Sequence, residues 1–111
     1  MTDHENTNIS KNFQNISKID KLIHEPARLM IMGYLYVVES ADFLFIMRQT
    51  GLTKGNLSSH LSKLESGGLV DIKKEFVGKI PRTFLSLTEK GRMEFDNYRK
   101  RMNIFLQNLS R

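Results

Sequence analysis

The spacing of apolar residues changes twice along the chain, and this change limits the folds that the chain can adopt. Up to Leu64, apolar residues recur mostly at steps of three and four, which places them on one face of a helix. Between Leu69 and Leu87 the step becomes two, the spacing of a half-buried strand. From Phe95 to Leu109 it returns to three and four. The pattern therefore predicts a mostly helical α+β domain with one small hairpin late in the chain.

Length and composition exclude several classes of protein. The 111 residues allow one hydrophobic core but not two, and 40% hydrophobic residues are too many for a disordered chain. The absence of Cys excludes disulfides, thiolate metal sites and Cys nucleophiles. No apolar run approaches the ~18 residues of a membrane helix, and the polar start of the chain is not that of a signal peptide. We expect a cytoplasmic protein without a membrane partner.

Three helices are predicted in the first half of the chain. The apolar stripe of residues 9–23 predicts an amphipathic first helix, which ends before Pro26 because proline disfavours helical geometry in the preceding residue. A second helix begins near Glu25 and Pro26 and is apolar on nearly every side, so we expect it at the centre of the core. A close helix contact is one explanation for Gly33 within it. Ser40 is the expected N-cap of a short third helix, and Gly51 its left-handed end.

The second half predicts a helix, a hairpin and a last helix. Thr53 caps a fourth helix, which the glycine pair beginning at Gly67 ends. The alternating segment then forms a two-stranded hairpin with its turn at residues 78–81. Thr88 caps the last helix, whose apolar seam steps by three and four.

Charge is distributed unevenly between the two halves. Residues 1–52 carry five bases and six acids, whereas residues 53–111 carry twelve bases and six acids. The basic excess of the second half favours a polyanionic partner, because Lys and Arg release counterions from a phosphate backbone. A solvated basic surface without a polyanion is the alternative.

The order of these elements has the proportions of a helix-turn-helix followed by a wing, with Leu52 alone between Gly51 and Thr53. Residues 24–92 resemble the MarR/ArsR-like winged-helix transcription regulators. The residues that carry the resemblance are His24-Glu25-Pro26-Ala27-Arg28, Gly51-Leu52-Thr53-Lys54-Gly55-Asn56-Leu57-Ser58-Ser59-His60-Leu61, Leu64-Glu65, Gly68-Leu69-Val70, Pro81-Arg82-Thr83 and Leu87-Thr88-Glu89-Lys90-Gly91-Arg92.

The resemblance implies sequence-specific binding of duplex DNA, with the fourth helix in the major groove. On a helical wheel Leu57, Leu61 and Leu64 face the core, and the opposite face is small, polar and basic without an acid. A merely solvated face is the alternative. The predicted recognition residues are Thr53, Lys54, Gly55, Asn56, Ser58, Ser59, His60, Ser62 and Lys63.

Four bases of the hairpin form the predicted second DNA contact: Lys73, Lys74, Lys79 and Arg82. The resemblance places Lys79 and Arg82 at the minor groove or at flanking phosphates. Lysines that protect an exposed strand edge from aggregation are the alternative, and both roles are compatible for Lys73 and Lys74.

The helices outside residues 24–92 predict a homodimer. Residues 1–23 and 93–111 carry apolar stripes with little of their own protomer to cover them, so we expect both at a two-fold interface. Two recognition helices about 34 Å apart would then read a pseudo-palindrome. Both helices folding back on one protomer is the alternative. The predicted interface residues are Ile9, Phe13, Ile16, Phe95, Tyr98, Met102, Phe105 and Leu109.

The sequence therefore favours a transcriptional regulator, most often a repressor in the family that it resembles. A winged-helix module that binds proteins instead of DNA is the alternative. Catalytic motifs are absent, and His4, His24 and His60 lack the spacing of metal ligands, so we expect neither an enzyme nor a cofactor nor a metal. His24 and Glu25 fit a local cap, and His60 fits packing at the helix edge or a phosphate contact. A small-molecule effector is compatible with the sequence but not indicated by it.

Overall fold

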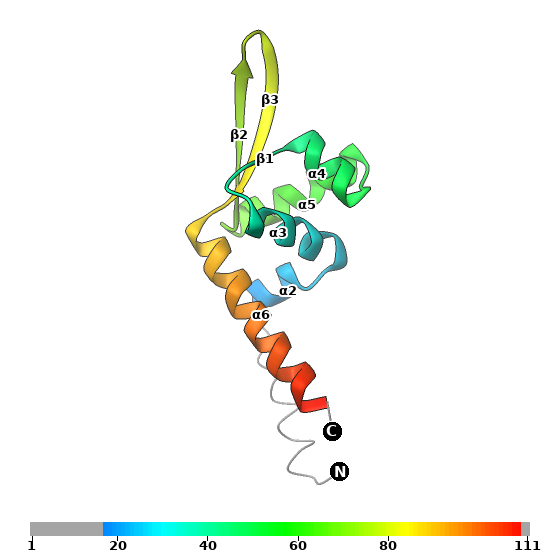
Figure 1. Ribbon diagram of the computed structural model, residues 1–111, viewed down its shortest axis with the longest axis vertical. Helices are drawn as coiled ribbons and strands as arrows, with labels where there is room; N and C mark the ends of the chain where they lie inside the picture. The colour runs from blue at the N-terminus through cyan, green and yellow to red at the C-terminus, as the bar shows by residue number, and fades with distance from the viewer. Residues whose placement is uncertain (1–16, 110–111) are drawn as a thin grey trace.

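The computed structural model describes residues 17–109 (Figure 1). These residues form five helices and a three-stranded antiparallel sheet in the order β1-β3-β2, which confirms the predicted α+β class. In chain order the elements are α2 (Lys18–Ile23), α3 (Pro26–Val37), β1 (Ala41–Asp42), α4 (Phe43–Thr50), α5 (Lys54–Ser66), β2 (Val70–Val77), β3 (Ile80–Leu87) and α6 (Glu89–Leu109).

Helix α3 lies at the centre of the core, as its apolar sequence predicted. Ile31, Met32 and Leu35 are fully buried in it, and α3 contacts α2, α4, α5, α6 and β3. The β2–β3 hairpin projects from one end of this helical body, and α6 extends away from the other end (Figure 1). The end of the hairpin and the end of α6 therefore lie far apart, at opposite ends of the described chain (Figure 1).

The first predicted helix is wrong at its boundary. Ser17 has an extended backbone and is the N-cap of α2, so the helix begins at Lys18. Its hydroxyl accepts a hydrogen bond from the amide of Asp20, and the Asp20 carboxylate accepts one from the amide of Ser17. This reciprocal capping box satisfies amides that a helix start leaves unpaired. Apolar spacing continues across Ser17 and therefore could not reveal the break; residues 9–16 lie outside the described range.

Two further expectations in the first half are wrong. Apart from the adjacent residues and the backbone of its own helix, no atom of residues 17–109 lies within 4 Å of a Cβ built on Gly33, so no close contact with another helix of this range explains that glycine. Asp42, rather than Ser40, is the N-cap of α4 and accepts a hydrogen bond from the amide of Leu44 at 2.7 Å. The chain before α4 is extended because Ala41 pairs with Leu85, which makes β1 a third strand that the sequence did not predict.

The turn between the helix-turn-helix elements and the cap after it are confirmed. Gly51 ends α4 with φ of 71°, the left-handed conformation that favours glycine. Thr53 then caps α5, because its hydroxyl accepts a hydrogen bond from the amide of Asn56 at 3.1 Å. Thr88 likewise caps α6 by accepting from the amide of Gly91 at 2.8 Å.

The hairpin is confirmed, but its turn is shorter than predicted. Val77 pairs with Ile80, so only two residues connect the strands, and Pro81 belongs to β3 opposite Phe76. Proline is tolerated there because β1 pairs with β3 only at Phe84 and Leu85, nearer the body. The strands therefore extend further from the helices than the sequence indicated.

Candidate nucleic-acid interface

Helix α5 is oriented as its periodicity predicted. Leu57, Leu61 and Leu64 are buried in the core. The opposite positions from Lys54 to Lys63 are exposed, and this stretch contains no acid. Small and polar residues keep that face narrow enough for a groove about 12 Å wide. The predicted recognition residues that are exposed are Thr53, Lys54, Gly55, Asn56, Ser58, Ser59, Ser62 and Lys63.

His60 differs from the other predicted recognition residues because it faces the scaffold. Its Nδ1 lies 3.2 Å from Nη1 of Arg28 and 3.7 Å from a carboxylate oxygen of Glu25. Glu25 is the N-cap of α3, and it accepts a hydrogen bond from the amide of Arg28 at 2.8 Å. Burial tends to raise the pKa of Glu25, but the amides of Arg28 and Ala27 and the neighbouring bases lower it overall. His60 thus joins α5 to the start of α3.

The bases of the hairpin have different surroundings. Lys73, Lys74 and Lys79 are exposed, and Nζ of Lys73 lies 3.6 Å from the carboxylate of Glu75. Arg82 donates to Asp42 at 3.0 Å. Burial tends to raise the pKa of Asp42, whereas the hydrogen bonds from Arg82 and from the amide of Leu44 lower it overall. Arg82 is therefore tied to the start of α4 in the protein without DNA.

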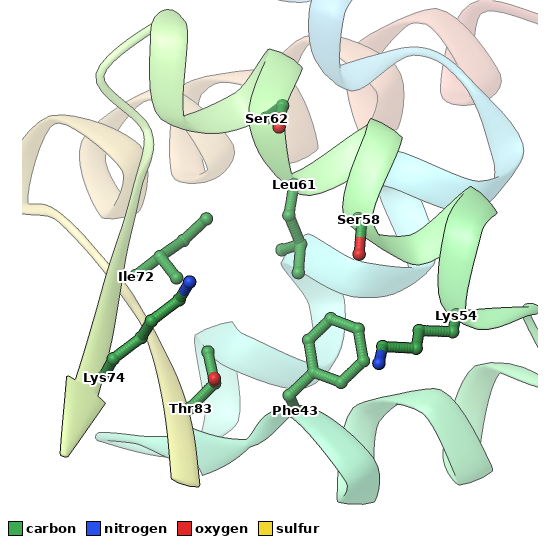
Figure 2. Close-up of a pocket in the computed structure, with 8 residues that line it drawn as sticks. All are labelled: Phe43, Lys54, Ser58, Leu61, Ser62, Ile72, Lys74 and Thr83. Carbon is green, nitrogen blue, oxygen red and sulfur yellow. The ribbon is translucent and has the colours of Figure 1, made fainter. Parts of the chain in front are cut away.

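A cavity of about 350 Å³ lies between α5 and the hairpin (Figure 2). Lys54 and Lys74 lie on opposite sides of it, and Leu61 points into it from α5 (Figure 2). Its lining combines an apolar floor with two ammonium groups and three hydroxyls, which suits an anion with a non-polar neighbour such as a sugar-phosphate. The lining residues are Phe43, Lys54, Ser58, Leu61, Ser62, Ile72, Lys74 and Thr83.

Sequence reasoning missed part of this cavity. Phe43 and Thr83 line it, and they also line a second cavity of about 340 Å³ beside Asp42 and Arg82. Both residues reach this position because β1 pairs with β3 and starts α4 next to the hairpin. A two-residue strand has too short a pattern to be recognised from its sequence.

The predicted dimer residues are placed differently from one another. Phe95 and Tyr98 are already buried in the core of the protomer, and Met102 packs against that core. Phe105 is half-buried and Leu109 exposed, whereas Ile9, Phe13 and Ile16 lie outside the described residues. The assignment of these residues to an interface, and the division into residues 1–23, 24–92 and 93–111, stay predictions.

Residues 17–109 contain neither a metal-binding cluster nor a helix that could span a membrane. Within this range no group of three or more His, Cys, Asp or Glu side chains is arranged to hold a metal ion. No helix of this range combines the length and the apolar character needed to cross a membrane.

Comparison with known proteins relates this geometry to a family. The model of the winged helix DNA-binding domain matches residues 27–106. An uncharacterised protein of Methanocaldococcus jannaschii is 37% identical over 78 residues, which cover 70% of this chain and 85% of that protein. The structure of a transcriptional regulator homologue from Pyrococcus horikoshii OT3 is 31% identical with a TM-score of 0.82, covering 89% of this chain and 97% of that one.

A more distant likeness concerns the fold alone. The transcriptional regulator PcaV from Streptomyces coelicolor is 16% identical with a TM-score of 0.70, and the match covers 94% of this chain and 74% of that one. The family match, the relatives and the fold agree with the resemblance to MarR/ArsR-like regulators that the motifs predicted. The chain belongs to the winged helix DNA-binding domain family.

Proposed function

We propose that the protein is a sequence-specific transcriptional regulator that binds duplex DNA as a homodimer, with α5 in the major groove and the hairpin on the minor groove or backbone. The observation that carries the proposal is the stretch of α5 from Lys54 to Lys63, whose exposed positions include no acid, beside a lysine-lined cavity between α5 and the hairpin. Phosphate contacts position such a protein, and base contacts select the sequence.

Several exposed side chains of α5 and of the hairpin have a chemistry suited to this role. Asn56 can pair with the edge of adenine, and Lys63 can contact guanine or phosphate. Lys54 and Lys74, on the two sides of the cavity, suit one phosphate of the strand between the two grooves. Arg82 must exchange Asp42 for a phosphate before it can contact DNA.

The second half of α6 supports the homodimer. The last residue of α6 that is buried is Tyr98, although the helix continues to Leu109. Ile104 and Leu109 are about half exposed. A second copy of the chain that packs on these turns would remove their apolar surface from water. This assignment retains Leu109 from the predicted interface and adds Ile104.

A dimer bound across a promoter blocks access to it, so repression is the mode that we propose. Because the proposed ligand is duplex DNA, we place the protein in the compartment that holds the chromosome, predicted from the sequence to be the cytoplasm. A protein-binding module is the second candidate, and the first experiment below distinguishes it.

Changing Lys54, Lys63 and Lys74 together to Gln is expected to weaken duplex binding strongly and to flatten its salt dependence. If Lys54 and Lys74 together neutralise one phosphate and Lys63 neutralises a second, the magnitude of the slope of log K against log salt falls by about 2, at roughly 0.9 per phosphate. Fluorescence anisotropy with duplexes selected from a random pool, repeated at several salt concentrations, measures both quantities.

The matched control is Lys100→Gln, which removes one positive charge from an exposed position on α6. It is expected to leave the salt slope unchanged. Equal slopes for the triple variant and the wild type would contradict the placement of DNA on α5 and the hairpin. Failure of the wild type to bind any selected duplex would favour the protein-binding module.

Changing Ile104 and Leu109 to Ser is expected to convert the dimer into a monomer, because both changes place a hydroxyl in the proposed interface. Sedimentation velocity at tens of micromolar measures the state. Met93→Ser, at an exposed apolar position nearer the body on α6, is the control and should remain dimeric. A monomeric wild type would refute the dimer but not DNA binding.

A further inference from the structure

We propose that Phe76 is an apolar wedge at the end of the hairpin, which enters the minor groove and unstacks a base step. The inference rests on the proposed function, namely that duplex DNA is the ligand. It starts from the exposure of the hairpin end, where 75% of Phe76 and 58% of Ile80 are accessible to solvent. Charged side chains, not a phenyl ring, were expected to make this contact.

The register of the hairpin determines the direction in which Phe76 points. Residues directly opposite each other share a face of the sheet, and the pairs alternate between the two faces. Ile72–Leu85, Lys74–Thr83 and Phe76–Pro81 therefore lie on one face. Leu85 of this face is buried in the core, and Ile72, Lys74 and Thr83 line the cavity against α5. Phe76 thus continues the face that carries α5.

The order of features along this face is the order of features across duplex DNA, namely a major groove, a phosphate strand and a minor groove. From Ile72 to Phe76 the strand advances about 13 Å, at roughly 3.3 Å per residue. The face presents α5 first, then the cavity between Lys54 and Lys74, and then Phe76. With α5 in the major groove, the cavity lies at a phosphate strand. Phe76, one step further, lies at the adjacent minor groove.

The charges around Phe76 favour a nucleic acid over an apolar protein surface. Lys74 precedes it by two positions on the same face, and Lys79 is exposed in the turn beside it. The neighbouring acid, Glu75, belongs to the opposite face with Arg82, and its carboxylate lies 3.6 Å from Nζ of Lys73. A phenyl ring flanked by lysines suits the minor groove, because the ring can meet the stacked bases while the lysines meet the phosphates on either side. Minor-groove proteins use Phe, Leu and Pro in this way to open base steps.

The test compares Phe76→Ser with Val77→Ser. Val77 is the next residue of β2 and is 50% exposed, but it lies on the opposite face with Ile80. The two variants therefore remove exposed apolar surface at the same distance from the core and differ in its direction. The probes are duplexes selected with the wild type, carrying 2-aminopurine in turn at each adenine flanking the major-groove site.

The wild type is expected to raise 2-aminopurine fluorescence at one flanking step, because an unstacked base is less quenched. Phe76→Ser should abolish this rise and weaken binding about tenfold, within the range measured for base–aromatic stacking. Its salt slope should stay that of the wild type, since no charge is lost. Val77→Ser should keep the fluorescence rise and bind within about twofold of the wild type.

The other possible outcomes contradict either the wedge or the proposed function, and they distinguish between the two. A wild type that binds DNA without a fluorescence rise, or a Phe76→Ser variant that retains it, refutes the wedge and leaves the regulator intact. Equal losses in both variants also refute it, because direction would then have no effect. A changed sedimentation coefficient in Phe76→Ser assigns the hairpin end to contact between copies of the chain. A wild type that binds no duplex refutes the proposed function itself.

Discussion

Replacing Gly91 by Ala is expected to destabilise the fold by about 3 kcal/mol or more, or to prevent folding. Gly91 is buried in the first turn of α6, where the helix crosses the start of β2. A Cβ at this position would lie 2.0 Å from the carbonyl oxygen of Leu69 and 2.8 Å from its carbonyl carbon. Backbone atoms cannot rotate away as a side chain can, so the first turn of α6 would have to move away from Leu69.

Urea denaturation followed by circular dichroism measures this effect, with Gly33→Ala as the matched control. Gly33 also lies within a helix, but no described atom is within 4 Å of its added Cβ. Alanine there should stabilise the fold by up to about 1 kcal/mol, through helix propensity alone. Similar stabilities for the two variants would contradict the close contact between α6 and Leu69.

Changing Asp20 to Asn is expected to destabilise the fold by about 2–3 kcal/mol. Only 2% of Asp20 is exposed, and its carboxylate accepts hydrogen bonds from Arg101 and from the amide and hydroxyl of Ser17. Breaking a buried ion pair by removing one partner typically loses 3–5 kcal/mol. We expect a smaller loss for Asp20→Asn because Arg101 is partly exposed, so water can solvate its guanidinium once the carboxylate is removed. The same denaturation measurement tests it.

The same carboxylate makes stability depend on acid pH. Burial by itself raises the pKa of Asp20, but the hydrogen bonds from Arg101 and Ser17 outweigh it and hold the pKa below its ordinary value of 3.8. The folded state therefore binds the proton less readily than the unfolded state. The stabilisation is complete well above pH 4 and is lost as the pH falls through the lowered pKa.

Asp20→Asn should consequently lose less stability than the wild type between pH 5 and pH 3, with a difference of at most about 1 kcal/mol. Asp71→Asn, at an exposed position of β2, is the control and should follow the wild type. A wild-type acid dependence in Asp20→Asn would show that other carboxylates dominate the acid sensitivity.

Helix α5 was predictable because its determinants are local. Gly51 ends one helix, Thr53 caps the next, and the spacing of Leu57, Leu61 and Leu64 defines the buried side. These signals act within a few residues of one another, so the exposed face of α5 follows from the sequence. The hairpin was predictable for the same reason, since alternation and a glycine turn are local patterns.

The contacts around the hairpin were not predictable in this way. The sequence did not reveal that Arg82 bonds to Asp42, 40 residues earlier in the chain. It also did not reveal that Phe95 and Tyr98 close the core of the protomer, where the Tyr98 hydroxyl lies 2.5 Å from Nδ1 of His24. A helical stripe shows that a face is covered, but not whether the same chain or a second copy covers it.

The sequence by itself therefore determined the order of the elements, the caps at Thr53 and Thr88, and the polar face of α5. Apolar periodicity and helix capping depend on residues within one or two helical turns of each other. A single segment of the sequence is therefore enough to predict them. Only the tertiary structure decided the third strand, the pairing of Arg82 with Asp42, and the direction of Phe76 at the end of the hairpin. These depend on strand register and on contacts between distant segments, which form only when the core brings α4, α5 and the hairpin together.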